Sequence, residues 1–564
     1  MGRRYAYIVV VLVAIALTAI ALGATPAAVD MCSRLMHNSS LRSLPNTTIT
    51  SAETVSGTFT PPDGGKPIEG LPSFCRVTAT IKPSPVSDIK VEVWMPSSGW
   101  NGKLEGVGNN GLAGSIMYVQ PRATDVYHGA LADAIKSGYA GVSTDTGHVT
   151  SDRTWLTNEE KERDYGYRAI HGMTVDAKAI VQKFYGSSAK HSYFNGCSTG
   201  GGQALGEAQL YPKDYDGILA GDSQNILTHA RANDIWLTQM VASDPASKPT
   251  VASLTLVTKA ALKLCGGDYG APEDGFLSAD PRECWFGPEQ LLCKAGQDPA
   301  TCLTAPQVKL VQKMYEGFII RTTNQIVMPG FPVGSEGPEG PGTVGWVRSK
   351  KLFSAGNIDP ADAAAQFYLL GVLQNPNADI RTMDLESALK SADEKFPYIN
   401  HVSTDLDAFM QGGKLLMYHG WDDPSITVYN SINYYSAVVD ALRDKRRLGQ
   451  AAALAEAQRS ARLFLVPGMV HCGGGPGPDT FNPLDALDQW VDHGVAPDRV
   501  IGAHVTNGAT KFSRPLCPYP QEAEYKGSGD RNDAANWVCF IPGRNDKEHW
   551  NFEMYDRKVY KRNE

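Results

Sequence analysis

The stretch Gly196-Cys197-Ser198-Thr199-Gly200 follows an apolar, β-prone segment at 191–194 and precedes a helix-forming segment from Gly201 to Leu210. Its pattern is Gly-x-Ser-x-Gly, in which glycines flank the serine because a sharp turn from strand to helix leaves no room for side chains. The first amides of a helix that starts at such a turn point toward the serine. The sequence therefore predicts that Ser198 is an exposed nucleophile at the end of a strand.

A serine hydroxyl reacts readily only when a base removes its proton and an acid orients that base. Two later segments supply these groups. The strand predicted over 414–418 runs into two aspartates before Pro424, and the strand predicted over 461–466 runs into His471. Serine, acid and histidine then follow one another in the order of the α/β-hydrolase fold. Two aspartates before a proline are also a common turn and most histidines are structural, so the prediction depends on the three groups together.

At these residues the chain resembles the tannase and feruloyl esterase family, which also includes the hydrolase of mono(2-hydroxyethyl) terephthalate. Family members carry a Cys-Ser, Asp, His-Cys pattern, matched here by Cys197-Ser198, Asp423 and His471-Cys472. The resemblance implies an α/β-hydrolase core and a catalytic triad of Ser198, Asp423 and His471. It extends over nearly the whole chain after the amino terminus, through segments 106–114, 143–148, 216–221 and 514–520.

The chemistry that this triad predicts is ester hydrolysis through an acyl-enzyme. The histidine takes the proton of Ser198, the aspartate orients the histidine, and water later releases the acyl group. The oxyanion needs two N–H donors. One is expected from Thr199, directly after the nucleophile, and the other from the glycine-rich turn 108–111, where Gly111 is favoured. The alternative for that turn is a simple tight bend.

Length and composition agree with a globular enzyme of more than one domain. The chain has 564 residues, too many for one ordinary core, with 42% hydrophobic and 20% charged residues. The formal net charge is -8 and no basic stripe is present, which argues against a nucleic-acid partner. Nothing in the sequence indicates an oligomeric state.

The amino terminus has the layout of a secretory signal peptide, predicted over residues 1–28. Arg3 and Arg4 precede an apolar run from Ile8 to Leu22, and small residues follow up to Ala28. The alternative is a membrane anchor, although the run is short for a span. We therefore expect a secreted or periplasmic protein with no stable membrane association after cleavage.

Ten cysteines in an exported chain indicate disulfides before metal ligands or free thiols. Spacing alone leaves the pairing open, and no C-x-x-C pair supports a zinc site. The resemblance implies the pairs Cys32–Cys75, Cys197–Cys472, Cys265–Cys284, Cys293–Cys302 and Cys517–Cys539.

The rhythm of strands and helices predicts a discontinuous core. The candidate strands are Asp88–Trp94, Tyr139–Ser143, Tyr193–Gly196, Ile218–Ala220, Leu415–Tyr418 and Arg462–Val466. Between the fourth and fifth, the pattern changes to helical segments such as Thr304–Tyr315 and Asp359–Leu373, with a Gly/Pro-rich run. We expect core residues 29–226 and 405–564, interrupted by a large lid domain over 227–404 that closes over the nucleophile.

The family's substrates are esters of aromatic acids, namely ferulate, gallate, chlorogenate or terephthalate monoesters, and the sequence does not choose among them. An aromatic acyl group needs a flat apolar slot. Trp346 and Phe353 would line such a slot from the lid, or else belong to the lid core. His419, four residues before Asp423, resembles a family position near the substrate, and its alternative is a buried histidine at a strand end.

No cofactor is expected for catalysis, but the family binds a structural calcium ion in a loop between paired lid cysteines. In this chain Asp268 and Asp274 would be ligands, while glycines follow the cysteine where an aspartate is expected. A solvated acidic loop is the alternative.

Rival functions are a serine peptidase or acyltransferase with the same triad, and a noncatalytic binding protein, which would not need all three triad residues.

Overall fold

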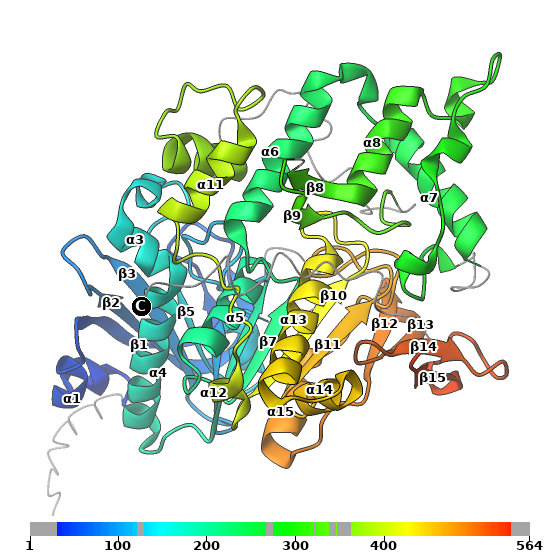
Figure 1. Cartoon of the computed structure of the whole chain (residues 1–564). Helices are drawn as coiled ribbons and strands as arrows, with labels where there is room; N and C mark the ends of the chain where they lie inside the picture. Colours follow the sequence, from blue (N-terminus) through cyan, green and yellow to red (C-terminus); the bar gives the residue numbers. More distant parts are fainter. Residues whose placement is uncertain are drawn as a thin grey trace, which may run out of the picture.

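A mixed sheet of nine strands forms the centre of the molecule (Figure 1). The computed structural model describes residues 31–120, 129–266, 274–320, 322–337, 346 and 362–542. The strand order is β1-β2-β3-β5-β4-β6-β7-β10-β11. The strands are β1 (Thr47–Phe59), β2 (Ile68–Ile81), β3 (Ile89–Pro96), β4 (Lys103–Val107), β5 (Ala140–Thr144), β6 (His191–Cys197), β7 (Gly217–Gly221), β10 (Lys414–Gly420) and β11 (Ala461–Val466).

The register of the parallel strands brings the site together. From β5 to β11 all neighbouring strands are parallel, whereas β1, β2 and β3 form an antiparallel ribbon that joins at β5. Cys197 at the end of β6 pairs with Gly221 at the end of β7, and Tyr418 of β10 pairs with Gly221 from the other side. The loops that follow these three strands therefore leave the sheet side by side.

Helices cover both faces of the sheet, as the alternation of buried side chains in β10 illustrates. Leu415 and Met417 belong to the core that contains the apolar faces of α4, α5 and α13, whereas Leu416 and Tyr418 pack with α15 on the other face. A strand buried on both sides reads as a continuous apolar run, which is what the sequence has here. These helices are α2 (Leu131–Lys136), α4 (Ala169–Tyr185), α5 (Thr199–Leu210), α13 (Val428–Arg446) and α15 (Pro483–His493).

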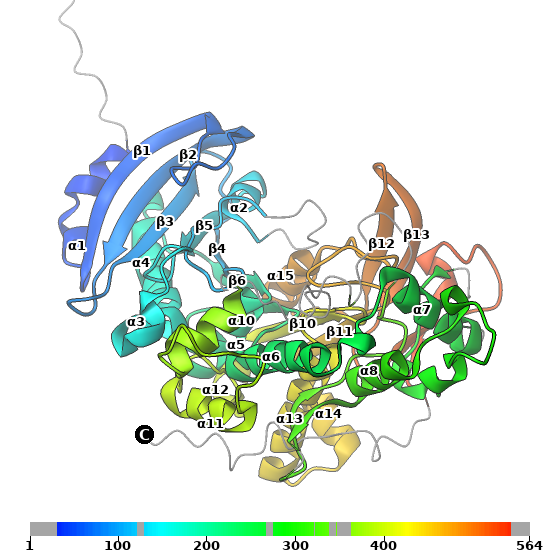
Figure 2. The same ribbon diagram turned by 90° about the horizontal axis from the view of Figure 1, so that it is seen from above.

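A large insertion, which we call the lid insertion, separates β7 from β10 and lies above the sheet in Figure 1. It has a hydrophobic core of its own, with Leu237, Val257 and Trp346 among its members. Figure 2 views the molecule from above and shows the helices of the lid insertion on the side that faces the viewer. Its elements are α6 (Leu227–Ser243), α7 (Val251–Cys265), α8 (Ala305–Glu316), β8 (Gly317–Ile320), β9 (Gln325–Pro329), α10 (Ala363–Gln366) and α11 (Leu385–Lys395), and the short α12 (Asp407–Met410) follows the insertion and packs against the main core.

This is the predicted architecture of an interrupted α/β core. The helix expected over 304–315 is α8, and the segment expected over 359–373 contains α10 and a π-helical turn at Phe367–Val372. The domain limits at 227 and 404 stay predictions, although α6 begins at Leu227. The predicted signal peptide lies outside the described residues. No helix among the described residues is long and apolar enough to cross a membrane.

The remaining elements are short or lie near the carboxyl terminus. They are α1 (Ser39–Arg42), α3 (Glu159–Arg163), α14 (Gln450–Ala457), β12 (Val500–Thr506), β13 (Ala509–Leu516), β14 (Glu522–Tyr525) and β15 (Trp537–Phe540). Five disulfides have the pairing that the resemblance implies: Cys32–Cys75, Cys197–Cys472, Cys265–Cys284, Cys293–Cys302 and Cys517–Cys539.

Candidate active site

The serine turn between β6 and α5 has the strained backbone of a nucleophile elbow. Ser198 has a φ of 63°, which a residue with a side chain rarely adopts. A Cβ on Gly196 would lie 2.4 Å from the carbonyl oxygen of Gly200, and one on Gly200 would lie 3.2 Å from Cα of Gly108. The glycines of the motif are therefore required by close backbone approach, and the half-buried Ser198 is held at the tip of the turn.

The three residues predicted as a triad form one hydrogen-bonded chain. His471 Nε2 is 2.9 Å from Ser198 Oγ, and His471 Nδ1 is 2.7 Å from Asp423 Oδ2. The other oxygen of Asp423 accepts the N–H groups of Ser425 at 2.7 Å and Ile426 at 3.0 Å. With Nδ1–H donated to the carboxylate, Nε2 is left as the acceptor for the serine proton.

The electrostatics of the two adjacent aspartates differ. Burial would raise the pKa of Asp423, but the electrostatic interaction with His471 and hydrogen bonds from His419 and His471 outweigh it, so its pKa lies below the usual carboxyl range. Burial raises the pKa of Asp422 well above that range, and Glu336 adds to the shift. Among the residues that the structure describes, none forms a hydrogen bond to the buried Oδ2 of Asp422. The surroundings therefore favour the ionised form of Asp423 and the neutral form of Asp422.

The glycine-rich turn after β4 lies against the serine turn. The Thr199 hydroxyl donates to the carbonyl of Gly111, whose φ is 59°. Thr199 is the first residue of α5, so its N–H has no acceptor within the helix. On the same turn, Asn109 accepts from Gln203 Nε2 at 3.0 Å, and its N–H donates to Gln203 Oε1 at 2.9 Å. The structure thus brings Gly111 into contact with Thr199, the residue that follows Ser198.

Asp222, which sequence reasoning did not single out, joins the loops of the site. Its Oδ1 accepts the N–H of Gly420 at 2.9 Å and its Oδ2 accepts the N–H of Cys472 at 2.7 Å. It is fully buried, and its φ of 38° is unusual for a residue with a side chain. It also lies beside the Cys197–Cys472 disulfide, whose Cα atoms are 6.1 Å apart. The histidine loop is therefore fixed by a covalent bond and by a buried carboxylate. The only signal in the sequence was a polar residue directly after a buried strand.

His419 lies behind the triad rather than in the open site. Its side chain is 0% exposed, and its ring nitrogens contact the Ser431 hydroxyl at 2.7 Å and the carbonyl of Ile426 at 2.9 Å. Of the two alternatives for this residue, its position is that of the buried histidine at a strand end. A direct contact with substrate does not fit this position.

Of the two aromatic residues expected to line the acyl slot, one is buried and the other lies outside the described residues. Trp346 is 1% exposed, donates from Nε1 to Ser335 Oγ at 3.0 Å and packs against Tyr315 in the core of the lid insertion. Phe353 lies outside the described residues. The lid insertion reaches the site at another point, where the Thr427 hydroxyl donates to the carbonyl of Gly330 at 2.6 Å. This bond ties the insertion to the loop that carries the triad acid.

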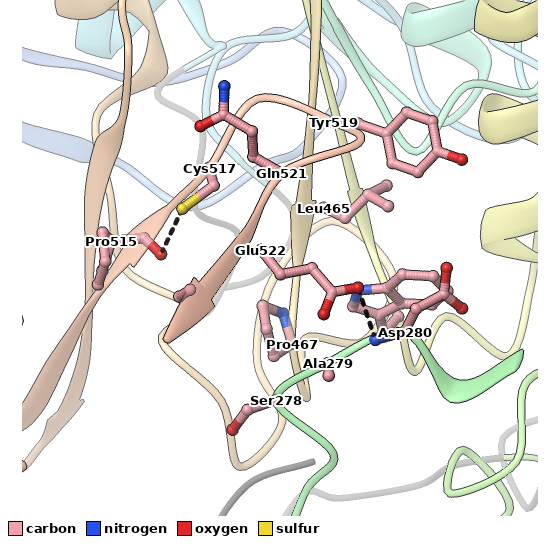
Figure 3. Close-up of a pocket in the computed structure, with 12 residues that line it drawn as sticks. Ser278, Ala279, Asp280, Leu465, Pro467, Pro515, Cys517, Tyr519, Gln521 and Glu522 are labelled. Carbon is pink, nitrogen blue, oxygen red and sulfur yellow. Dashed lines mark hydrogen bonds between the residues drawn. The ribbon is translucent and has the colours of Figure 1, made fainter. Parts of the chain in front are cut away.

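A small pocket between the lid insertion and the carboxyl-terminal segment is separate from the triad (Figure 3). Its lining includes Ser278 and Asp280 of the insertion and Leu465, Tyr519 and Glu522 of the core. The side chain of Glu522 accepts the N–H of Asp280 at 3.1 Å across it. No triad or predicted oxyanion residue lines this pocket, so it belongs to the seam between the insertion and the core.

The predicted calcium ligands are only partly described. Asp268 lies outside the described residues. Asp274 Oδ2 faces two cations, with Arg514 Nη2 at 3.5 Å and Arg531 Nη2 at 3.7 Å. A carboxylate between two guanidinium groups already has its counter-charge, so the surroundings of Asp274 do not fit a calcium ion. A calcium site in the preceding loop stays a prediction.

Comparison with known proteins identifies relatives along nearly the whole chain. Residues 75–540 match the family model of tannase and feruloyl esterase. The chain is 34% identical over 535 residues to an uncharacterised esterase of Xanthomonas campestris pv. campestris, covering 88% of this chain and 89% of that protein. It is 31% identical over 533 residues to the mono(2-hydroxyethyl) terephthalate hydrolase of Piscinibacter sakaiensis, covering 84% and 85%. The crystal structure of feruloyl esterase B from Aspergillus oryzae matches with a TM-score of 0.78 at 29% identity, covering 90% of this chain and 99% of that one.

Proposed function

Because the chain belongs to the tannase and feruloyl esterase family and is a carboxylic ester hydrolase, we propose that it cleaves esters of aromatic acids through an acyl-enzyme on Ser198. The observation that carries this proposal is the hydrogen-bonded chain from Ser198 through His471 to Asp423. It is built on loops that follow β6, β10 and β11, and the surroundings of its fully buried acid favour the ionised form.

In the first half of the reaction His471 Nε2 takes the proton of Ser198 as Oγ attacks the acyl carbon. The positive charge that forms on His471 is stabilised by Asp423, 2.7 Å away. The negative charge that forms on the carbonyl oxygen requires N–H donors beside the serine. We assign these donors to Thr199, at the start of α5, and to Gly111, on the turn that Thr199 contacts.

The first half ends when His471 gives its proton to the leaving alcohol, whose bond to the acyl carbon breaks and leaves the acyl-enzyme. In the second half His471 removes a proton from a water molecule, which attacks the acyl carbon, and then gives that proton to Ser198 Oγ as its bond to the acyl carbon breaks. The proposed steps use protein groups and water. The half-buried position of Ser198 leaves one side of the serine open to substrate.

The choice of aromatic acids is supported by the relatives. The feruloyl esterase and the terephthalate monoester hydrolase share an aromatic acyl group but not an alcohol, so the acyl side is the common element. We infer that the acyl group lies under the lid insertion.

Five disulfides support a location outside the reducing cytoplasm, in agreement with the predicted export.

A panel of esters tests the proposal. The purified full chain is assayed with methyl ferulate, methyl gallate, chlorogenate and a terephthalate monoester, with an aliphatic methyl ester of similar size as the control. We expect kcat/KM for at least one aromatic ester to exceed that of the aliphatic ester by about a hundredfold or more. Equal rates would contradict the assignment of substrate class. Parallel assays with an amide analogue and with alcohol acceptors separate the esterase from a peptidase or an acyltransferase.

A further inference from the structure

A second histidine and a second carboxylate lie directly behind the Ser198–His471–Asp423 chain. His419 Nε2 is 3.3 Å from Asp423 Oδ2 and 3.5 Å from Asp222 Oδ1. The side chains of Asp222, His419 and Asp423 are all 0% exposed. Carboxylates and imidazoles alternate along one row that ends at the serine: Asp222, His419, Asp423, His471 and Ser198.

The hydrogen bonds of His419 indicate where its protons lie. The carbonyl oxygen of Ile426, 2.9 Å from Nε2, can only accept, so Nε2 carries a proton. Nδ1 is 2.7 Å from the hydroxyl of Ser431, which can accept a hydrogen bond from a protonated Nδ1. Both ring nitrogens can therefore be protonated at once with an acceptor for each.

The surrounding charges favour this doubly protonated form. Burial lowers the pKa of His419, but Asp222 and Asp423 outweigh burial, and the net shift of the pKa is upward. Burial raises the pKa of Asp222 above its ordinary value, and the charge of His419 opposes this shift. Each oxygen of Asp222 also accepts one backbone N–H, from Gly420 and from Cys472, and these bonds favour the ionised carboxylate. Two buried carboxylates with no cation between them would repel each other, and one would take up a proton.

We propose that His419 is a resident imidazolium and acts as a positioning residue, keeping Asp423 ionised and in place beside His471. With His419 charged, the row carries one net negative charge before the reaction. That charge offsets the positive charge that His471 acquires when it takes the serine proton. With His419 neutral, two negative charges would be buried beside His471, and Asp423 would compete for the proton that His471 donates.

The groups that face this ring come from four elements among the described residues. Asp222 follows β7, Asp423 follows β10, and His471, beyond Asp423, follows β11. Helix α13 contributes the neutral hydroxyl of Ser431. The charge of His419 is therefore set by the two carboxylates and by its distance from His471.

The kinetic test depends on the proposed function and uses the full chain with the ester that it cleaves best. His419→Gln keeps an N–H toward Ile426 but removes the charge. The acid limb of the kcat/KM profile, which reports the ionisation of His471, should move up by about one pH unit. Asp222→Asn removes a negative charge and should move the limb down. Ser431→Ala, the matched control, removes a hydrogen bond from the same ring without a change in charge and should leave the limb in place. A limb that neither charge variant moves would overturn the proposal.

The charge of His419 is also measurable without any activity. The full chain is labelled with ¹⁵N at histidine, and the His419 ring signals are those that shift in Ser431→Ala and disappear in His419→Gln. If His419→Gln does not fold, the Ser431→Ala shift alone identifies them. Both nitrogens should be protonated at about pH 8, above the ordinary histidine pKa of about 6.5. If the protein is an active esterase and one ring nitrogen of His419 is unprotonated at that pH, the proposal is wrong. Two protonated nitrogens in a protein without esterase activity would reject only the proposed function.

Discussion

Gln203 holds Asn109 through two hydrogen bonds that join the helix behind the nucleophile to the glycine-rich turn. Its Nε2 donates to Asn109 Oδ1 at 3.0 Å, and its Oε1 accepts the Asn109 N–H at 2.9 Å. Both residues are buried. Because α5 starts at Thr199 and the turn contains Gly111, this pair sets the spacing of the two assigned oxyanion donors.

Replacing Gln203 by Leu should therefore lower kcat by about ten- to a hundredfold with a smaller change in KM. The reason is that a displaced donor weakens the transition state more than the bound substrate. Gln209→Leu is the matched control, since Gln209 lies on the same helix but bonds to the His401 carbonyl and the Tyr434 hydroxyl. Steady-state kinetics check the prediction, and equal losses of kcat in the two variants would contradict it.

The neighbouring aspartates should respond differently to the same substitution. Asp423→Asn should lower kcat by roughly 10⁴-fold, because an amide there stabilises the wrong tautomer of His471. Asp422→Asn should cost less than about tenfold, since burial favours the neutral form of Asp422 and an amide resembles the neutral acid. A larger loss of kcat from Asp422→Asn would reverse the assignment of the triad acid.

The disulfide between Cys197 and Cys472 should matter more for geometry than for folding. It joins the residue before Ser198 to the residue after His471 across a sequence separation of 275. In the double variant Cys197→Ala with Cys472→Ala, kcat should fall by about a hundredfold, since a misplacement of ~1 Å between reacting groups has that effect. Circular dichroism should still show a folded protein. Full activity in the double variant would show that the bridge does not position the triad.

Glu105 should make stability depend on pH. It is 1% exposed in β4, accepts from Asn195 Nδ2 at 2.9 Å, and burial raises its pKa from the ordinary value of 4.5 to about 8. The folded state then binds more protons than the unfolded state between these values. The contribution of Glu105 to the free energy of unfolding is therefore complete below pH 4.5 and is lost as the pH rises through about 8, the pKa of Glu105 in the folded state.

Glu105→Gln removes this dependence and keeps an oxygen for Asn195. Urea unfolding at about pH 5 and about pH 9 should show the variant gaining stability relative to the parent as pH rises. If the two proteins lose stability in parallel over that range, Glu105 is ionised in the folded state and the account of its burial is wrong.

The sequence predicts the parallel part of the sheet better than the antiparallel part. Strands β6, β7, β10 and β11 are short apolar runs followed by polar turns, and their positions agree with the prediction within a few residues. Of the parallel strands, β4 was not predicted, and of the antiparallel ones, β1 and β2 were not predicted. In β1, most side chains are exposed or half-buried and many are Thr or Ser, so no apolar alternation marks the strand. Pairing with β2 rather than the local pattern determines its conformation.

The site shows the same division between local and long-range information. Ser198, Asp423 and His471 each follow a recognisable strand, and their order in the chain is a signature. The Asn109–Gln203 pair has no such signature, because its two amides are 94 positions apart and lie in different motifs. The charge of His419 depends on two carboxylates whose distances only the fold determines.

Substitution of Ser198 by Ala tests the central claim most directly. In the proposed mechanism the hydroxyl forms the acyl-enzyme, and its removal creates no clash at the turn. With the best aromatic ester of the panel, we expect kcat of the Ser198→Ala variant to fall by about 10⁵-fold or more, while the variant still binds substrate with a similar Kd. Thr199→Ser is a matched control in which the nucleophile, the hydroxyl to Gly111 and the assigned N–H donor remain. Ester hydrolysis at a near-normal rate by a folded Ser198→Ala protein would contradict the account.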